Sequence, residues 1–323
     1  MSEQDQHALP LESRLAALGQ DGRVTADEVL FLRRTVFADG VVSDHELDAL
    51  FALGERAPAG DPEWPQFFAE AASDFYLREE EPEGYLTREE FASLKTRVMR
   101  KGGANALERQ LLIKLMESAR SVPTEMSAFV GAALKAGVMA KDGGPAIDKG
   151  DVALLRRWLF AAGGDGHVGV TRAEAEVLCD INDAVRGGEA DPAWGELFSL
   201  AIVNHLMAGL GYSAASREEA MRRHAFISDH SVEVGGFFRR MAAGVFDAFR
   251  GAKQKSVYEQ RAEDRDAAVA AAEKVMPEEA SWLAIRIGRD GAFDDNERRV
   301  VERMKELGAD LPEELKALVD RAA

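Results

Sequence analysis

The sequence predicts an all-α protein made of tandem three-helix repeats. Helix-start signals recur along the chain, and apolar residues follow them at helical spacing. No segment combines sustained apolar and polar alternation with β-branched side chains, as a strand would. We therefore expect the repeats to pack as an array or bundle that one helical insertion interrupts.

The repeat appears when the chain is compared with itself. A shift of 62 positions needs no gap and places Thr25 on Thr87 and Leu50 on Leu112. A third copy begins at Ile147, and a shift of 251 positions reveals a fainter fourth copy. Repeats of this length are stacked units, each too small to bury its apolar face alone. The predicted segments are an N-terminal helical lead-in (1–23), repeat 1 (24–80), repeat 2 (86–140), repeat 3 (147–209), a helical insertion (210–275) and a degenerate repeat 4 (276–323).

A capping box opens the first helix in each of the first three repeats. In this motif the first side chain accepts from unpaired backbone N–H groups, and the acid three positions later reaches back. In repeat 1, Val29, Leu32 and Val36 then follow at helical spacing. The predicted pairs are Thr25 with Glu28, Thr87 with Glu90, and Asp148 with Asp151.

A glycine turn is expected to end the first helix, and a second capping box to begin the next. Gly40 suits the end of a helix because glycine adopts the left-handed conformation at little cost. The second capping boxes are Ser43 with Glu46, Asn105 with Glu108, Thr171 with Glu174, and Asp294 with Glu297.

The third helix follows a linker that contains proline, "GDPEW" in repeat 1 and "ADPAW" in repeat 3. Its first aromatic residues are Trp64 and Trp194, and Phe67 continues the apolar face in repeat 1. We interpret both tryptophans as packing anchors between units rather than as platforms for a ligand. Cys179, on the second helix of repeat 3, is interpreted as a small buried residue.

The turn "FADGVVSDHE" looks like half of a calcium-binding loop. Such a loop needs oxygen ligands at positions 1, 3, 5, 9 and 12 and glycine at position 6. With Asp39 at position 5, Gly40 and Glu46 fall correctly, but Phe37 takes position 3 and offers no ligand. Two interpretations stay open: a helix-ending turn with a capping box, or a noncanonical site for Ca²⁺ or another divalent cation. The ligands of that cation site would be Asp39, Asp44, Glu46, Asp290, Asp294, Asp295 and Glu297.

The same order of residues carries a family resemblance. A helix, Asp-Gly, an apolar residue, a Ser, Thr or Asp, two residues and Glu occur in "FADGVVSDHE" and in "GRDGAFDDNE". In these segments the chain resembles the tellurite-resistance TerB-like family of helical proteins. The resemblance implies an all-helical fold, acidic residues suspected of binding metal, and a role in stress-related assemblies, often near membranes. Repeat 2 departs from the pattern because Lys101 stands in place of the acid.

The insertion contains a basic, phenylalanine-rich stretch, "VGGFFRRMAAGVFDAFRGAK", on a chain whose formal net charge is −17. The stretch reads as one amphipathic helix, and three roles are open to it. Its apolar stripe packs against the repeats, docks in the groove of a partner protein, or lies on an anionic membrane. For a partner surface the contact residues would be Phe237, Phe238, Arg239, Arg240, Met241, Val245 and Phe249.

Charge and composition restrict the class of function. The net charge of −17 repels nucleic acid over most of the surface, so we expect no nucleic-acid partner. One cysteine and an N-terminus without signal-peptide features favour a cytoplasmic protein. No motif for nucleophilic, metal-assisted or cofactor catalysis is found, and the two histidines His224 and His230 lack metal-ligand spacing.

These observations favour a non-catalytic binding or scaffold protein with an unidentified protein partner and no cofactor. A divalent-cation sensor that uses the acidic turns is the alternative from another class. An enzyme whose acidic cleft forms only in three dimensions is the third.

Overall fold

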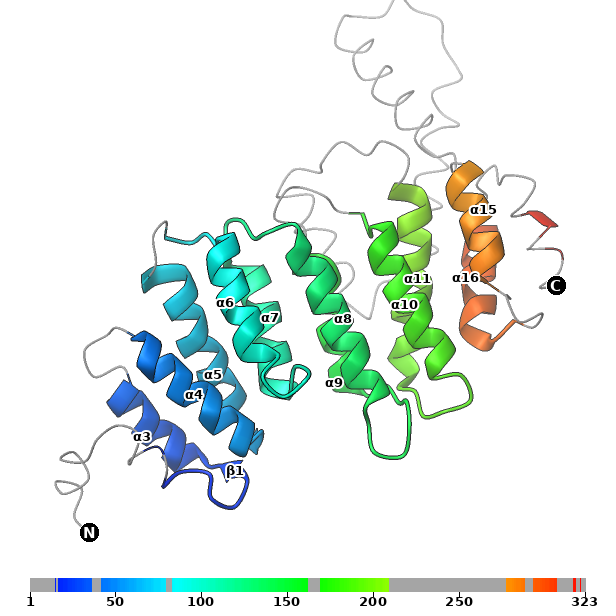
Figure 1. The fold of residues 1–323 in the computed structure, drawn as a ribbon. Coiled ribbons are helices and arrows are strands. Elements are labelled where there is room, and N and C mark those ends of the chain that lie inside the picture. Colours follow the sequence, from blue (N-terminus) through cyan, green and yellow to red (C-terminus); the bar gives the residue numbers. More distant parts are fainter. Residues whose placement is uncertain are drawn as a thin grey trace, which may run out of the picture. The chain divides into compact units, whose positions relative to one another are not determined.

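The fold of this chain is a series of helices, shown in Figure 1 from a computed structural model. The structure describes residues 15, 17–36, 42–79, 83–161, 169–208, 277–287, 293–306, 316–317 and 320. The chain divides into two compact units, residues 1–165 with 183–191 (unit 1) and residues 166–182 with 192–323 (unit 2). The prediction of a mostly helical fold is confirmed for the described residues.

Unit 1 contains seven named α-helices and one π-helix among its described residues. The π-helix η1 (Phe75–Glu79) continues directly from α5. The α-helices are α3 (Ala26–Val36), α4 (Asp44–Arg56), α5 (Glu63–Asp74), α6 (Arg88–Val98), α7 (Ala106–Ser118), α8 (Glu125–Met139) and α9 (Lys149–Ala161).

Unit 2 contains the greater part of α10 (Arg172–Ala184), together with three further helices in the described part of the chain. These are α11 (Pro192–Ala208), α15 (Pro277–Arg286) and α16 (Asp295–Glu306). None of the described helices in either unit combines the length and the apolar character that crossing a bilayer requires.

All seven predicted capping boxes are present. For Ser43 and Glu46, the Ser43 hydroxyl accepts from the Glu46 N–H at 3.3 Å, and the Glu46 carboxylate accepts from the Ser43 N–H at 2.8 Å. The same two hydrogen bonds form in the other six pairs, so α3, α4, α6, α7, α9, α10 and α16 each begin at the residue after the predicted cap.

The expectation of a chain without any strand is wrong at one place. Strands β1 (Arg23–Val24) and β2 (Ala59–Gly60) pair in parallel, and isolated parallel bridges join Tyr85 to Ser121 and Ile147 to Ala190. A pair only two residues long leaves no alternation in the sequence, so no pattern could reveal it. Gly60 permits the approach, because a Cβ there would lie 2.5 Å from the Val24 carbonyl oxygen.

The core of unit 1 forms around α5, which packs against α3, α4 and α7. Trp64, Phe67 and Phe68 are fully buried on this helix, and Trp64 meets Phe68 edge to face with ring centroids 5.7 Å apart. The Trp64 Nε1–H donates to the Ala57 carbonyl at 3.0 Å. Burial of each such ring contributes a few kcal/mol, about 1.5–3 for a large apolar side chain.

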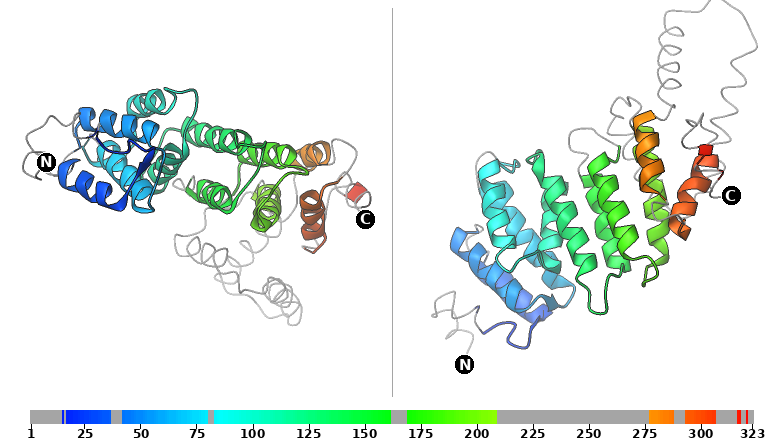
Figure 2. Two further views of the ribbon diagram at one scale, coloured as in Figure 1. Left: turned by 90° about the horizontal axis from the view of Figure 1, so that it is seen from below. Right: turned by 45° about the vertical axis from the view of Figure 1, so that its right-hand side comes forward.

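A close contact joins α8 and α9, which lie side by side (Figures 1 and 2). The indole of Trp158 on α9 is 1% exposed and lies directly over Gly131 on α8. Its Nε1–H donates to the Ser127 carbonyl at 3.1 Å, which fixes the ring against the helix. A Cβ at position 131 would lie 2.5 Å from Trp158 Cζ2, so only glycine fits there.

Unit 2 is organised by Asn182, which is 2% exposed. Its Oδ1 accepts from Trp194 Nε1 at 3.2 Å and from Asn296 Nδ2 at 2.8 Å, and its Nδ2 donates to Asp294 Oδ2 at 2.7 Å. Asn182 thus links α10 to the first turns of α11 and α16. The helices α11 and α16 also pack directly on each other, with Gly195 facing Asn296.

The Gly131 contact gives a direct test of this packing. We expect Gly131→Ala to lower the free energy of unfolding by about 1–3 kcal/mol, because the added methyl overlaps a ring that cannot move aside. Gly103→Ala is the control, since a Cβ at Gly103 meets nothing within 4 Å. Both are measured by urea unfolding; a Gly131→Ala protein as stable as the Gly103→Ala protein contradicts the contact.

Candidate functional site

Two of the predicted metal ligands in repeat 1, Asp44 and Glu46, already bind groups of the protein itself. The Glu46 carboxylate accepts from the Ser43 N–H and hydroxyl, both at 2.8 Å. Asp44 accepts from the guanidinium of Arg97 at 2.5 Å. Asp39 lies outside the described residues, so the structure places only Asp44 and Glu46 of this set.

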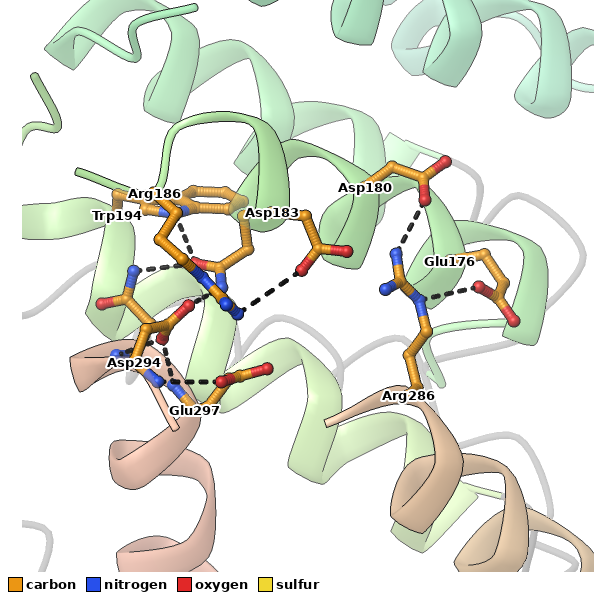
Figure 3. Close-up of polar contacts among 10 residues, drawn as sticks. Glu176, Asp180, Asp183, Arg186, Trp194, Arg286, Asp294 and Glu297 are labelled. Atoms are coloured by element: carbon orange, nitrogen blue, oxygen red, sulfur yellow. Dashed lines mark hydrogen bonds and ion pairs between the residues drawn. The ribbon is translucent and has the colours of Figure 1, made fainter. Parts of the chain in front are cut away.

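The corresponding acids at the start of α16 also make hydrogen bonds or ion pairs, and Figure 3 shows those of Asp294 and Glu297. Asp294 Oδ1 accepts from the Glu297 N–H at 2.8 Å, and its Oδ2 accepts from Asn182. The Glu297 carboxylate accepts from the Asp294 N–H at 2.9 Å. Asp295 pairs with Arg298 at 3.0 Å and is 91% exposed. Asp290 lies outside the described residues.

Across the described part of the chain, no three His, Cys, Asp or Glu side chains come together where they could hold a metal ion. The predicted partner contacts, Phe237, Phe238, Arg239, Arg240, Met241, Val245 and Phe249, all lie outside the described residues. Cys179 is 3% exposed, as predicted for a small buried residue.

The structure instead reveals a buried arginine cluster that the sequence did not indicate. Arg97 on α6 is 7% exposed in its side chain and donates to Asp48 at 2.9 Å, in addition to Asp44. It also donates to the Tyr76 hydroxyl at 3.1 Å. Burial raises the pKa of Asp48, but hydrogen bonds from Arg97 and Arg100 outweigh it and hold the pKa below the usual range.

Two further arginines join helices in the same way. Arg286 on α15 is 8% exposed and binds Glu176 at 3.3 Å and Asp180 at 2.7 Å on α10 (Figure 3). Arg157 on α9 holds Glu117, near the end of α7, through two bonds of 2.8 and 2.7 Å. Two-pronged pairs of this type fix the orientation of the two helices as well as their distance.

A buried carboxyl, that of Glu108, lies at the start of α7 within the influence of the partly buried Glu55. Glu108 is 3% exposed, and burial raises its pKa, which the capping hydrogen bond from Asn105 opposes and the charge of Glu55 reinforces. The resulting pKa is about 7. Glu55 Oε1 is buried without a hydrogen-bond partner, while its Oε2 lies 3.3 Å from Lys101. The Glu108 carboxyl therefore titrates near neutral pH.

A groove of about 670 Å³ opens in unit 1 at the end of α5. Its walls come from α3, α5, η1 and α7, which place charged side chains of both signs around it. Ser73, 5% exposed, lines the groove, and its Oγ has no hydrogen-bond partner. The lining is Arg33, Glu70, Ser73, Asp74, Leu77, Arg78, Glu83, Gly84, Lys114, Ser118 and Arg120.

The groove could not be found from the sequence, because its residues come from segments up to 87 positions apart, from Arg33 to Arg120. One signal existed locally. The run "SDFYLRE" carries charges of both signs after an apolar helix, and the helix widens to the π-form over Phe75–Glu79. Such widening is rare and often occurs at functional sites.

Comparison with known proteins found no matching family model, no matching curated protein and no matching solved structure. No relative therefore points to a site, and we choose the groove in unit 1 as the candidate from the geometry of this chain.

The Glu108 carboxyl predicts a dependence of stability on pH. In the unfolded chain it ionises near the ordinary glutamate pKa of 4.5, and in the folded chain near about 7. Its neutral form is therefore favoured by folding. This contribution is complete below pH 4.5 and is lost as the pH rises through about 7.

Glu108→Gln keeps an oxygen for the capping bond but carries no charge. We expect it to gain stability relative to the native protein between pH 5 and pH 8, by about 1–3 kcal/mol at the upper end. Glu90→Gln, the same change in a less buried capping box, is the control in the urea unfolding series. A Glu108→Gln difference that stays constant across this range would show that the carboxyl is not held neutral.

Proposed function

We propose that this chain is a non-catalytic helical binding or scaffold protein, built from tandem three-helix repeats. The observation that carries this proposal is the repeated parallel bridge. Arg23 pairs with Ala59, and Tyr85 pairs with Ser121, each 62 positions further along the chain. Ile147 and Ala190 make the same kind of bridge before α9 and α11. Each bridge joins a residue shortly before a first helix to a residue shortly before a third helix.

The arginine pairs support the same proposal, because they occupy matching positions. Subtracting 62 from Arg97 and 251 from Arg286 gives position 35 in both cases. Each arginine binds acids on the second helix of the preceding predicted repeat, Asp48 for Arg97 and Glu176 for Arg286. Stacked repeats of this type expose continuous surfaces that characteristically bind other proteins.

The resemblance to the TerB-like family extends the proposal to a role in a stress-response assembly. The support is limited to the turns and the capping boxes that follow them. In the described residues the acids of these boxes accept backbone N–H groups, which is the structural role rather than the metal-binding role. We therefore favour a scaffold over a cation sensor, and over an enzyme.

A capture experiment tests the scaffold. The tagged chain is expressed at native level and recovered from its own cells, and we expect it to retain protein partners through a wash of moderate salt. Phe237→Asp with Phe249→Asp should abolish the recovery if the basic helix is the contact. Ile285→Asp is the control, since Ile285 is an apolar residue that is already 71% exposed.

The outcomes separate the open roles of that helix. Equal recovery with an earlier melting temperature in the Phe237 and Phe249 variant assigns the stripe to the core. A native protein that retains no partner in any growth condition, including stress, contradicts the scaffold proposal.

A further inference from the structure

We propose that the groove in unit 1 binds an oxyanion group, a phosphate or a carboxylate, of a small molecule. Its volume of about 670 Å³ is within the range of small-molecule sites. The inference is independent of the scaffold proposal, because it concerns a groove within one unit and requires no protein partner.

Two of the four cations in the groove are already neutralised. Arg33 binds Glu70 at 2.9 Å, and its guanidinium also lies over the Phe67 ring at 5.4 Å. Arg78 lies 3.4 Å from Asp74. The charges within each of these two pairs largely cancel, so the pairs add little to the electrostatic potential inside the groove.

The other two cations, Lys114 and Arg120, pair with no carboxylate among the described residues. Lys114 is half-buried on α7, and Arg120 follows the end of that helix. Glu83 is the one remaining acid in the lining, so the groove carries an excess of positive charge. On a chain of net charge −17, this local excess favours an anionic ligand.

The backbone holds Arg120 in place beside the groove. Its N–H donates to the Gly84 carbonyl at 2.7 Å, and its side-chain stem lies against the Gly84 Cα. Gly84 has a φ of +83°, and a Cβ there would meet Arg120 Cδ and Nε at 3.3 Å. The positive φ favours glycine at this position, and a larger residue would push the Arg120 side chain aside by a few tenths of an ångström.

Ser73 supplies an independent indication of a ligand. A buried hydroxyl without a partner costs free energy, about 1–3 kcal/mol, and such groups are rare in folded proteins. Because no hydrogen bond holds the Ser73 side chain, it can turn about χ1 toward a bound group. Lysine provides a compact positive charge, arginine a planar guanidinium with several N–H donors, and the hydroxyl a neutral donor. These are groups that commonly bind an oxyanion.

Calorimetric titration of the full chain tests the proposal. The probes are inorganic phosphate, glycerol 3-phosphate and citrate, each at low ionic strength, and we expect saturable binding of at least one. Phosphate-bearing and carboxylate ligands are distinguished by which probe binds more tightly. Lys114→Met and Arg120→Met should each weaken binding by about tenfold or more, and added salt should weaken it further.

The control variants distinguish binding in the groove from nonspecific electrostatic attraction of the anion to the protein surface. Arg88→Met removes one exposed charge of unit 1 outside the groove and should leave binding unchanged. Arg120→Lys keeps the charge but loses the planar guanidinium, so it should give an intermediate loss. Ser73→Ala should weaken binding without lowering the melting temperature, because the Ser73 hydroxyl has no hydrogen bond to lose. The proposal is overturned if no probe binds up to about 10 mM, or if Arg88→Met weakens binding as much as Lys114→Met.

Discussion

The reciprocal capping box is the interaction on which this structure depends. Seven described helices begin with it, and in each the acid at the third helical position accepts a backbone N–H that would otherwise be unpaired. An acid in the first turn also interacts favourably with the helix dipole. Seven of the 57 acidic residues thus stabilise helix starts, and their carboxylate oxygens are already bonded within the protein.

Three arginines and one glycine contribute to the way in which these helices pack together. Arg97, Arg157 and Arg286 each reach acids on a neighbouring helix, and the first and last of these are almost completely buried. Gly131 lets the Trp158 ring lie on a helix backbone. A buried arginine with several partners is costly to break, because its removal leaves donors and acceptors unpaired. These polar contacts therefore add orientation to helices that already pack through their buried apolar side chains.

Sequence alone predicted what is local and missed what is distant. The capping boxes span four residues, so the seven helix starts that carry one could be placed to the residue. The ion pair of Arg97 with Asp44 joins positions 53 apart, and no periodic pattern in the sequence predicts it. The orphaned Ser73 hydroxyl and the groove beside it depend on how α3, α5 and α7 meet. The two-residue strands were missed for the same reason, since their partners are 36 positions apart (59 − 23).

Calorimetric titration with Ca²⁺, Mg²⁺, Mn²⁺ and Zn²⁺ tests the central claim that the acids after the turns cap helices. We expect no saturable heat from the native protein at millimolar metal. Glu46→Gln and Glu297→Gln, which keep the capping oxygen, should change the melting temperature little. Saturable binding that Glu46→Gln or Glu297→Gln abolishes would disprove the capping role, because it would make these carboxylates metal ligands.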